Sequence, residues 1–162
     1  QDMRSQTQMM EALGGTAVVM GFGDVYTGLQ TGIIDGAESN ETALTLSNHG
    51  EVAKVFSEDQ HAMIPDMLVM STDTWEVLSP EDRELIVEAA VASTQEHRVA
   101  WAEETQKARA RAAEEMNVQF VEDVNRASFR AATAGMVDQF STEYPGVQQV
   151  LDIVDANKGG AS

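Results

Sequence analysis

The sequence lacks several features that would each point to a class of protein. It contains no cysteine among its 162 residues, which excludes disulfides, thiol catalysis and cysteine-based zinc sites. Only 10 Lys and Arg residues stand against 27 Asp and Glu, a net charge of −17 at pH 7. This shortage of basic residues disfavours nucleic acid and anionic lipid as partners. No run of 18 or more apolar residues is present, so we expect no insertion into a membrane.

Apolar runs and helical stretches alternate over the first 78 residues. Short β-branched or apolar runs predict strands at 16–20, 33–34 and 61–70, the last weakened in its middle by Pro65. Between and before them, the sequence predicts helices over 7–13, 24–32 and 40–48, with Asp24 capping the second and Gly32 ending it. Strands that alternate with helices favour an α/β fold with a parallel or mixed sheet covered on both faces.

A long helix is predicted in the middle of the chain. Ser79-Pro80-Glu81-Asp82 is a strong helix start, with a Ser cap, Pro at the first position and two acids in the first turn. Residues 80–116 contain no further Pro and no Gly. If unbroken, the helix would be about 55 Å long, whereas a domain of this size has a radius of gyration of about 15 Å. Three interpretations stay open here: a break near 93–94, a coiled-coil arm, or a helix that spans two lobes.

The remaining residues predict a short strand at 118–121 and helices over 125–144 and 147–154. No internal repeat is found. The first residues carry no strand or helix start of their own, and we expect the chain to begin in the middle of a fold.

Motifs for nucleotide or metal chemistry do not match. Gly21-Phe22-Gly23 lacks the spacing and the Lys of a phosphate loop. The three His residues have no zinc-hydrolase spacing, so neither a metal nor another cofactor is expected. The basic patch at 107–111 is typical of i,i+4 pairing with nearby Glu residues on one helix.

Arg4 is a different case. Apart from Lys54, it is the sole Lys or Arg before Arg83. A guanidinium at the end of an entering strand can hold a carboxylate through two parallel charge-assisted hydrogen bonds. The residues alone allow two interpretations equally, an anchor for a carboxylate ligand or an exposed terminal Arg.

Two stretches carry a resemblance to a known family. The run Met10-Glu11-Ala12-Leu13-Gly14-Gly15 is followed at 22–38 by FGDVYTGLQTGIIDGAE, and downstream come Ser71 to Trp75, LSPED at 78–82 and Ala89-Ala90. This pattern resembles the solute-binding proteins of tripartite ATP-independent periplasmic (TRAP) transporters, over nearly the whole chain.

The resemblance implies a periplasmic binding protein-like fold of two α/β lobes, of which this chain corresponds to the C-terminal half. We therefore expect a partial ligand-binding lobe at 1–78, a long lobe-spanning helix at 79–117, and a strand and helices at 118–162 that pack on the other lobe. The family also implies a periplasmic location.

Site residues are carried over position by position. Arg4 would match the arginine that clamps the ligand carboxylate, Phe22 an aromatic residue that lines the cleft, and His61 a frequent cleft position. Ser39 stands where many members have Asn, and Asn40 follows it as a substitute. The stretch from Arg4 to Leu13 is shorter than is usual in the family.

The resulting hypothesis is a non-enzymatic periplasmic protein that captures a small organic acid, such as a sugar acid or dicarboxylate, and passes it to membrane transporter subunits. Ligand binding would close a hinge and exclude water around the carboxylate. Two alternatives are an enzyme with Glu38 or His61 as general base, and an acidic helical interaction module without a small-molecule ligand.

Overall fold

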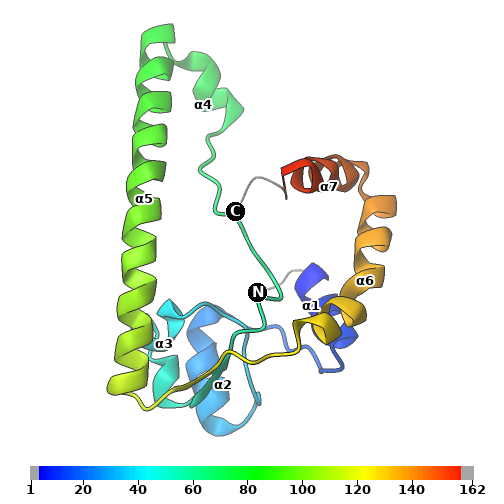
Figure 1. Ribbon diagram of the computed structural model, residues 1–162. Helices are drawn as coiled ribbons and strands as arrows, with labels where there is room; N and C mark the ends of the chain where they lie inside the picture. The colour runs from blue at the N-terminus through cyan, green and yellow to red at the C-terminus, as the bar shows by residue number, and fades with distance from the viewer. Residues whose placement is uncertain (1–3, 158–162) are drawn as a thin grey trace. The chain divides into compact units, whose positions relative to one another are not determined.

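The computed structural model describes residues 4–157, which divide into two compact units. Unit 1 contains residues up to 22, residues 59–61 and residues from 122 onward, and unit 2 contains residues 23–58 and 62–121. Helices and two paired strands occur along the described chain, which confirms the α/β class (Figure 1). The division of the chain at residues 78 and 117 that the family implies remains a prediction.

The elements follow one another in the order α1 (Arg4–Ala12), η1 (Phe22–Asp24), α2 (Val25–Thr31), α3 (Thr42–Leu46), η2 (His49–Glu51), β1 (Val55–Ser57), α4 (Thr72–Val77), α5 (Pro80–Glu114), β2 (Gln119–Val121), α6 (Arg126–Glu143) and α7 (Pro145–Asn157). The two η elements are single turns of 3₁₀ helix.

Helix α5 dominates unit 2 and is continuous over 35 residues, or about 52 Å (Figure 1). It begins as predicted, because the Ser79 hydroxyl accepts a hydrogen bond from the Asp82 amide at 3.1 Å. No break occurs near 93–94, where the Thr94 hydroxyl donates back to the Ala90 carbonyl inside the helix. Of the three interpretations left open by the sequence, the structure excludes a break near 93–94; that α5 bridges the lobes of the family fold remains a prediction.

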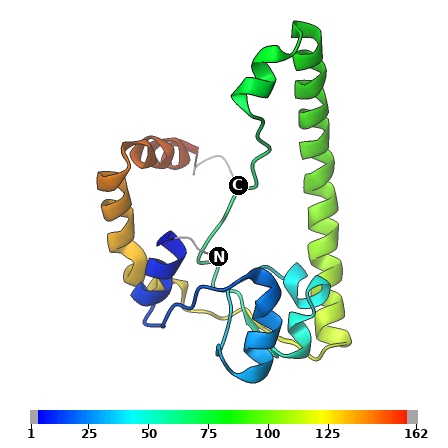
Figure 2. The same ribbon diagram turned by 180° about the vertical axis from the view of Figure 1, so that it is seen from behind.

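The core of unit 2 lies at the carboxyl end of α5. Strands β1 and β2 pair in parallel, with Phe56 opposite Phe120 and their ring centroids 5.5 Å apart. Buried Leu44, Ala112 and Val118 form a cluster against these rings. Helix α3 packs against α5, and both views show it beside the carboxyl end of that helix (Figure 2).

Unit 1 is helical in its described part. Helix α1 packs against α6, and α6 packs against α7. Helix α6 begins at Asn125, whose side-chain oxygen accepts from the Ser128 amide at 3.3 Å. Gly14, with φ of +88°, follows the end of α1 in the left-handed region that glycine adopts most readily. Gly159 and Gly160, which the sequence offers as a stop for the last helix, lie outside the described residues.

Three predicted strands are wrong. Within the described chain the one sheet ladder joins β1 to β2, so residues 16–20, 33–34 and 61–70 have no strand partner. The Ile33 and Ile34 amides are used instead to cap α2, since both donate to the Gly28 carbonyl, at 2.9 and 3.3 Å. Residues 62–70 are exposed throughout, and Pro65 supplies no amide for a ladder.

Other predictions hold with adjusted bounds. Helix α2 ends as expected at Gly32, whose φ is +72°. Asp24 occupies the N-cap position of α2, but its side chain makes no capping hydrogen bond. The helix expected over 40–48 shortens to α3, because Asn48 adopts a left-handed conformation with φ of +56°. The short strand β1 was not predicted from the sequence.

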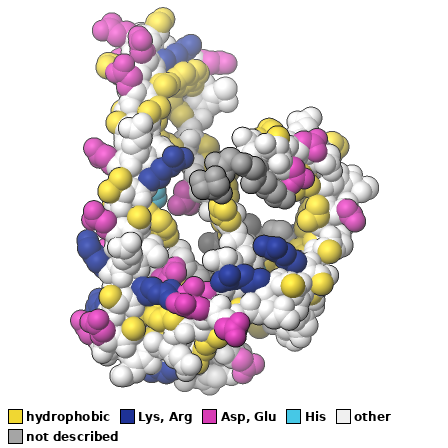
Figure 3. Space-filling model, viewed as in Figure 1, with side chains coloured by type: hydrophobic (Ala, Val, Ile, Leu, Met, Phe, Trp, Pro, Cys, Tyr) yellow, Lys and Arg dark blue, Asp and Glu magenta, His cyan; other side chains and the backbone are white. Residues whose placement is uncertain are grey.

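On the face of α5 that Figure 3 shows, charged and hydrophobic side chains are interspersed along the helix. Among the described helices none combines the length and apolar character that crossing a bilayer requires.

Candidate functional site

Ser39 and Asn40 line a cavity in unit 2. The cavity has a volume of about 50 Å³, and its other walls come from α2, α3, η2 and β1 through Leu29, Ala37, Ala43, Leu44, His49, Ala53, Val55 and Phe56. Ligand pockets usually have volumes of about 300–1,000 Å³. The cavity within unit 2 is therefore too small for a sugar acid, and the two polar residues are at a surface-accessible edge of it, with Ser39 half-buried and Asn40 exposed.

The Asn40 side chain is held by its neighbour two residues later. The Thr42 hydroxyl donates to Asn40 Oδ1 at 2.6 Å. The Asn40 carbonyl also accepts from the Ala43 amide at 3.2 Å, at the start of α3. Asn40 is thus tied at both its backbone and its side chain to the first turn of that helix.

His49 is a buried residue of the same cavity that the sequence did not single out as a site. His49 is 5 % exposed, and burial of its ring away from water lowers the pKa of its imidazole. The neutral imidazole is consequently the favoured form at pH 7.

Arg4 belongs to unit 1 and is the first residue of α1, so the prediction that it ends a strand is wrong. Its guanidinium forms an ion pair with Glu143 of α6 and lies 5.9 Å from the centroid of the Phe140 ring. The hydrogen bond from Arg4 lowers the pKa of Glu143. About half of the Arg4 side chain remains exposed. A ligand carboxylate at Arg4 would therefore compete with the Glu143 carboxylate for the same donors.

Phe22 and His61 also belong to unit 1. Phe22 opens the η1 turn and is 54 % exposed, so its ring is accessible. The His61 ring contacts the Asp59 carboxylate, with Nδ1 2.6 Å from Oδ1. The same carboxylate oxygen accepts from the His61 amide at 3.3 Å, which fixes the ring close to the backbone.

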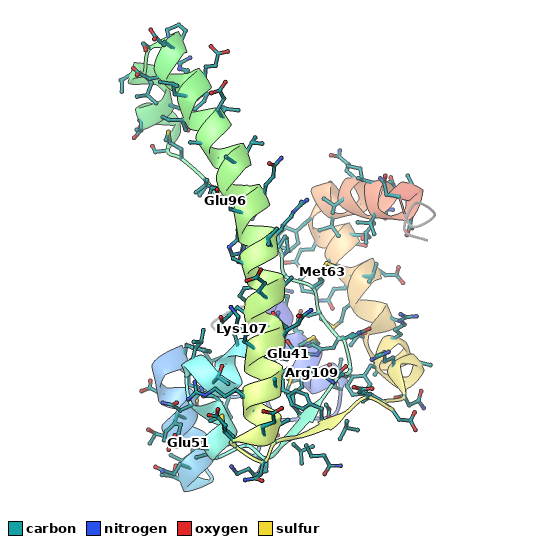
Figure 4. All side chains as sticks on the ribbon, turned by 60° about the vertical axis from the view of Figure 1, so that its left-hand side comes forward. Glu41, Glu51, Met63, Glu96, Lys107 and Arg109 are labelled. Carbon is teal, nitrogen blue, oxygen red and sulfur yellow. The ribbon has the colours of Figure 1, made fainter. Side chains whose placement is uncertain are left out.

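The basic residues at 107–111 of α5 form two kinds of ion pair, one within the helix and one with a distant residue (Figure 4). Lys107 pairs with Glu103 at 3.7 Å and Arg111 with Glu115 at 3.1 Å, which confirms the predicted i,i+4 pairing. Arg109 instead pairs with Glu58 beyond the end of β1, and its guanidinium carbon lies 4.4 Å from the centroid of the Phe120 ring.

A wider groove of about 370 Å³ lies at the carboxyl end of α5, lined by Glu51, Lys54, Arg111, Glu115, Met116 and Asn117. Its Lys54 ammonium donates to the Gly50 and Met116 carbonyls, both at 2.8 Å. Arg111 is paired with Glu115 as described above. Lys54 therefore links η2 to the residues that follow α5, and Arg111 pairs with a carboxylate one turn later in the chain.

The structure thus brings Ser39 and Asn40 together with His49 and Thr42 in unit 2, and assigns Arg4, Phe22 and His61 to unit 1. Thr42 and His49 were missed because nothing in the sequence marks them as partners of the loop at 35–40. A signal for Arg109 was present: it is out of phase with the series Glu103, Lys107, Arg111 and Glu115, which shares one face of the helix. In the described part of the chain, no group of three or more His, Asp or Glu residues could hold a metal ion.

Comparison with known proteins identifies the family. Residues 1–143 match the family described as bacterial extracellular solute-binding protein, family 7. A curated relative, the uncharacterized protein YiiZ of Salmonella typhimurium, is 42 % identical over 138 residues, which cover 84 % of this chain and 42 % of the relative.

Two solved structures extend the comparison. A TRAP periplasmic solute-binding protein from Anaerococcus prevotii with bound D-glucuronate is 35 % identical, with a TM-score of 0.93 over 100 % of this chain and 52 % of its own. One from a Sulfitobacter species with bound β-D-galacturonate is 30 % identical, with a TM-score of 0.85 over 93 % of this chain and 50 % of its own.

The chain spans about half the length of these relatives. The family match covers far more than half of the chain, and the two solved neighbours combine a high TM-score with sequence identities of 35 % and 30 %. The expected resemblance to TRAP solute-binding proteins is confirmed, and this chain belongs to the bacterial extracellular solute-binding proteins of family 7.

Proposed function

We propose that the full-length protein is a periplasmic solute-binding protein that captures a hexuronate or a closely similar sugar acid. The observation that carries this proposal is the likeness of the whole chain to a protein with bound D-glucuronate, at 35 % identity and a TM-score of 0.93. The neighbour with bound galacturonate supports the same ligand class, because glucuronate and galacturonate differ at one hydroxyl configuration.

The proposed recognition depends on a carboxylate and several hydroxyl groups. Arg4 supplies a planar donor pair suited to the carboxylate, once its exposed guanidinium exchanges Glu143 for the ligand. Ser39 and Asn40 supply hydroxyl and amide groups for sugar oxygens. Phe22 offers an exposed ring for the apolar face of a sugar, and His61 an imidazole fixed by Asp59.

The ligand is bound and released without chemical change in this proposal, and the recipient is the membrane part of a TRAP-type secondary transporter. Solute binding is the role that the family's description gives, and the solved neighbours are described as TRAP periplasmic solute-binding proteins. An assay that recovers the bound acid unmodified after incubation supports a non-catalytic role, whereas the appearance of a new product contradicts it.

Thermal unfolding of the full-length protein tests the ligand class. The panel is D-glucuronate, D-galacturonate, succinate and pyruvate, with D-glucose as the neutral analogue of glucuronate. A ligand at a hundredfold excess over its Kd stabilises the folded protein by about 2.7 kcal/mol. We expect a rise in Tm with one or both uronates and none with glucose. Unchanged melting across all four acids contradicts the proposal.

The role of Arg4 is tested separately with Arg4→Ala and the matched control Glu143→Gln. If Arg4 holds the carboxylate, Arg4→Ala abolishes the uronate shift. Glu143→Gln removes the competing carboxylate charge and leaves the shift equal or larger. A full shift in Arg4→Ala assigns the carboxylate to another cation.

A further inference from the structure

The orientation of the Asn40 amide is fixed by a single short hydrogen bond. The Thr42 hydroxyl donates to Asn40 Oδ1 at 2.6 Å, so the acceptor oxygen of the amide is already engaged. Asn40 itself is exposed, whereas Thr42 is only 7 % exposed. The buried Thr42 hydroxyl therefore holds the exposed Asn40 amide through this hydrogen bond.

Thr42 is well placed to hold this geometry. It is the first residue of α3, and the three residues after it, Ala43, Leu44 and Thr45, are all buried. The Thr45 hydroxyl donates to the Thr42 carbonyl at 3.3 Å, and the Ala43 amide donates to the Asn40 carbonyl. The position of the Thr42 hydroxyl is thus set by the core of unit 2 rather than by solvent.

The hydrogen bond from Thr42 changes which hydrogen-bonding groups the Asn40 side chain offers to a ligand. A free asparagine presents one acceptor oxygen and two N–H donors. With one lone pair of its oxygen taken by Thr42, Asn40 keeps a single acceptor site and both of its N–H donors. Donors favour the carboxylate and hydroxyl oxygens of a sugar acid, and the fixed rotamer lowers the entropy lost when the ligand binds.

We propose that Asn40 donates through its amide nitrogen to an oxygen of the bound sugar acid, and that Thr42 is the positioning residue that selects this orientation. The inference rests on the proposed function and goes beyond it by assigning to Thr42 the role of holding the Asn40 amide with its nitrogen free to donate.

Titration calorimetry of the full-length protein with D-glucuronate tests the donor role through Asn40→Asp. This substitution keeps the size of the side chain and replaces the N–H donors with a second carboxylate oxygen. Loss of the donor and repulsion of the ligand's charge should raise Kd by about 100-fold or more at pH 7. An Asn40→Asp variant that binds within threefold of the wild type overturns the inference.

The positioning role is tested with Thr42→Val, Thr42→Ser and a matched control, Thr133→Val. Thr42→Val removes the hydroxyl at nearly constant volume and should raise Kd by about fivefold, and Thr42→Ser, which retains the hydroxyl, should restore it. Thr133→Val removes a part-buried hydroxyl of α6 that donates to the Phe129 carbonyl, and it should leave Kd unchanged. Equal weakening by Thr133→Val and Thr42→Val contradicts a positioning role.

A double-mutant cycle separates positioning from general damage to the fold. In an Asn40→Ala background, Thr42→Val should have no further effect on Kd, because the amide it positions is gone. An undiminished effect shows that Thr42 acts on the fold alone. If the wild type binds no acid, the proposed function fails together with this inference; if it binds and these variants do not differ, only the inference fails.

Discussion

Gly50 of η2 lies between the backbone of α3 and the side chain of Met116, which follows α5. A Cβ atom at this position would meet Met116 Sδ at 2.9 Å, the Leu44 carbonyl oxygen at 3.1 Å and Met116 Cε at 3.2 Å. The methionine side chain can move, but the Leu44 oxygen belongs to the backbone of α3, and Leu44 is 5 % exposed in the core. Gly50→Ala therefore forces a shift of packed backbone.

The expected cost follows from this geometry. Overpacking a core by one methyl group typically lowers the free energy of unfolding by about 1–3 kcal/mol. We expect Gly50→Ala to fall inside that range, because the Leu44 carbonyl oxygen is packed backbone that cannot move aside. The matched control is Gly135→Ala in α6, where a Cβ meets nothing within 4 Å. In a helix this control should gain up to about 1 kcal/mol.

Urea unfolding of the full-length protein without ligand measures both variants, by tryptophan fluorescence for Gly50→Ala and by far-UV circular dichroism of the helices for Gly135→Ala. Trp75 and Trp101 lie in unit 2 and report on it. In a double-mutant cycle, Met116→Ala removes the side-chain part of the clash, so the two changes should couple by at least about 0.5 kcal/mol. A Gly50→Ala variant as stable as the wild type, or one that matches Gly135→Ala, refutes the reasoning.

Three further predictions concern a cap and two titrating groups. Ser79→Ala removes the acceptor of the Asp82 amide at the start of α5 and should cost about 1 kcal/mol in denaturant unfolding, whereas Ser79→Asp should cost little. Burial lowers the pKa of His49, so the unfolded chain binds the proton more readily. Stability should therefore fall as the pH drops below about 6.5 through the folded pKa, and a shallower fall is expected in His49→Gln; an unchanged slope contradicts it. Arg4 lowers the pKa of Glu143, so this pair stabilises the fold above the unfolded carboxyl pKa of about 4.3, and the contribution is lost as the pH falls through the folded value. Arg4→Ala should raise the pKa of Glu143 in carboxyl NMR titration, and no change would show that the pair does not form in solution.

Local signals explain what the sequence predicted well. A serine cap followed by Pro80 began α5 where expected, and Gly32 ended α2 in the left-handed conformation that glycine adopts most readily. These features depend on residues within one turn of one another. Helix bounds could therefore be predicted from the sequence to within a few residues.

The strands could not be predicted in this way. A strand is defined by a partner distant in the sequence, and β1 pairs with a segment more than 60 residues later. The apolar run at 16–20 resembles a strand more closely than Val55–Ser57 does, yet among the described residues only the latter has a partner. Ile33 and Ile34 were misassigned because their amides cap a helix.

The same distinction applies to the candidate site. The family pattern identified Arg4, Phe22, Ser39, Asn40 and His61 as candidates, and these roles remain predictions. Their surroundings depend on packing, such as the pairing of Arg4 with a residue 139 positions later. The link between Thr42 and Asn40 spans only two residues, but many side chains of this type two residues apart make no contact. Geometry was required to find it.

Calorimetric titration of the full-length protein with D-glucuronate, with D-glucose under the same conditions, tests the central claim most directly. The two sugars differ in the carboxylate alone. The account predicts saturable one-to-one binding of glucuronate and no heat of binding with glucose. Equal binding of both sugars, or of neither glucuronate nor galacturonate, would contradict the capture of a sugar acid.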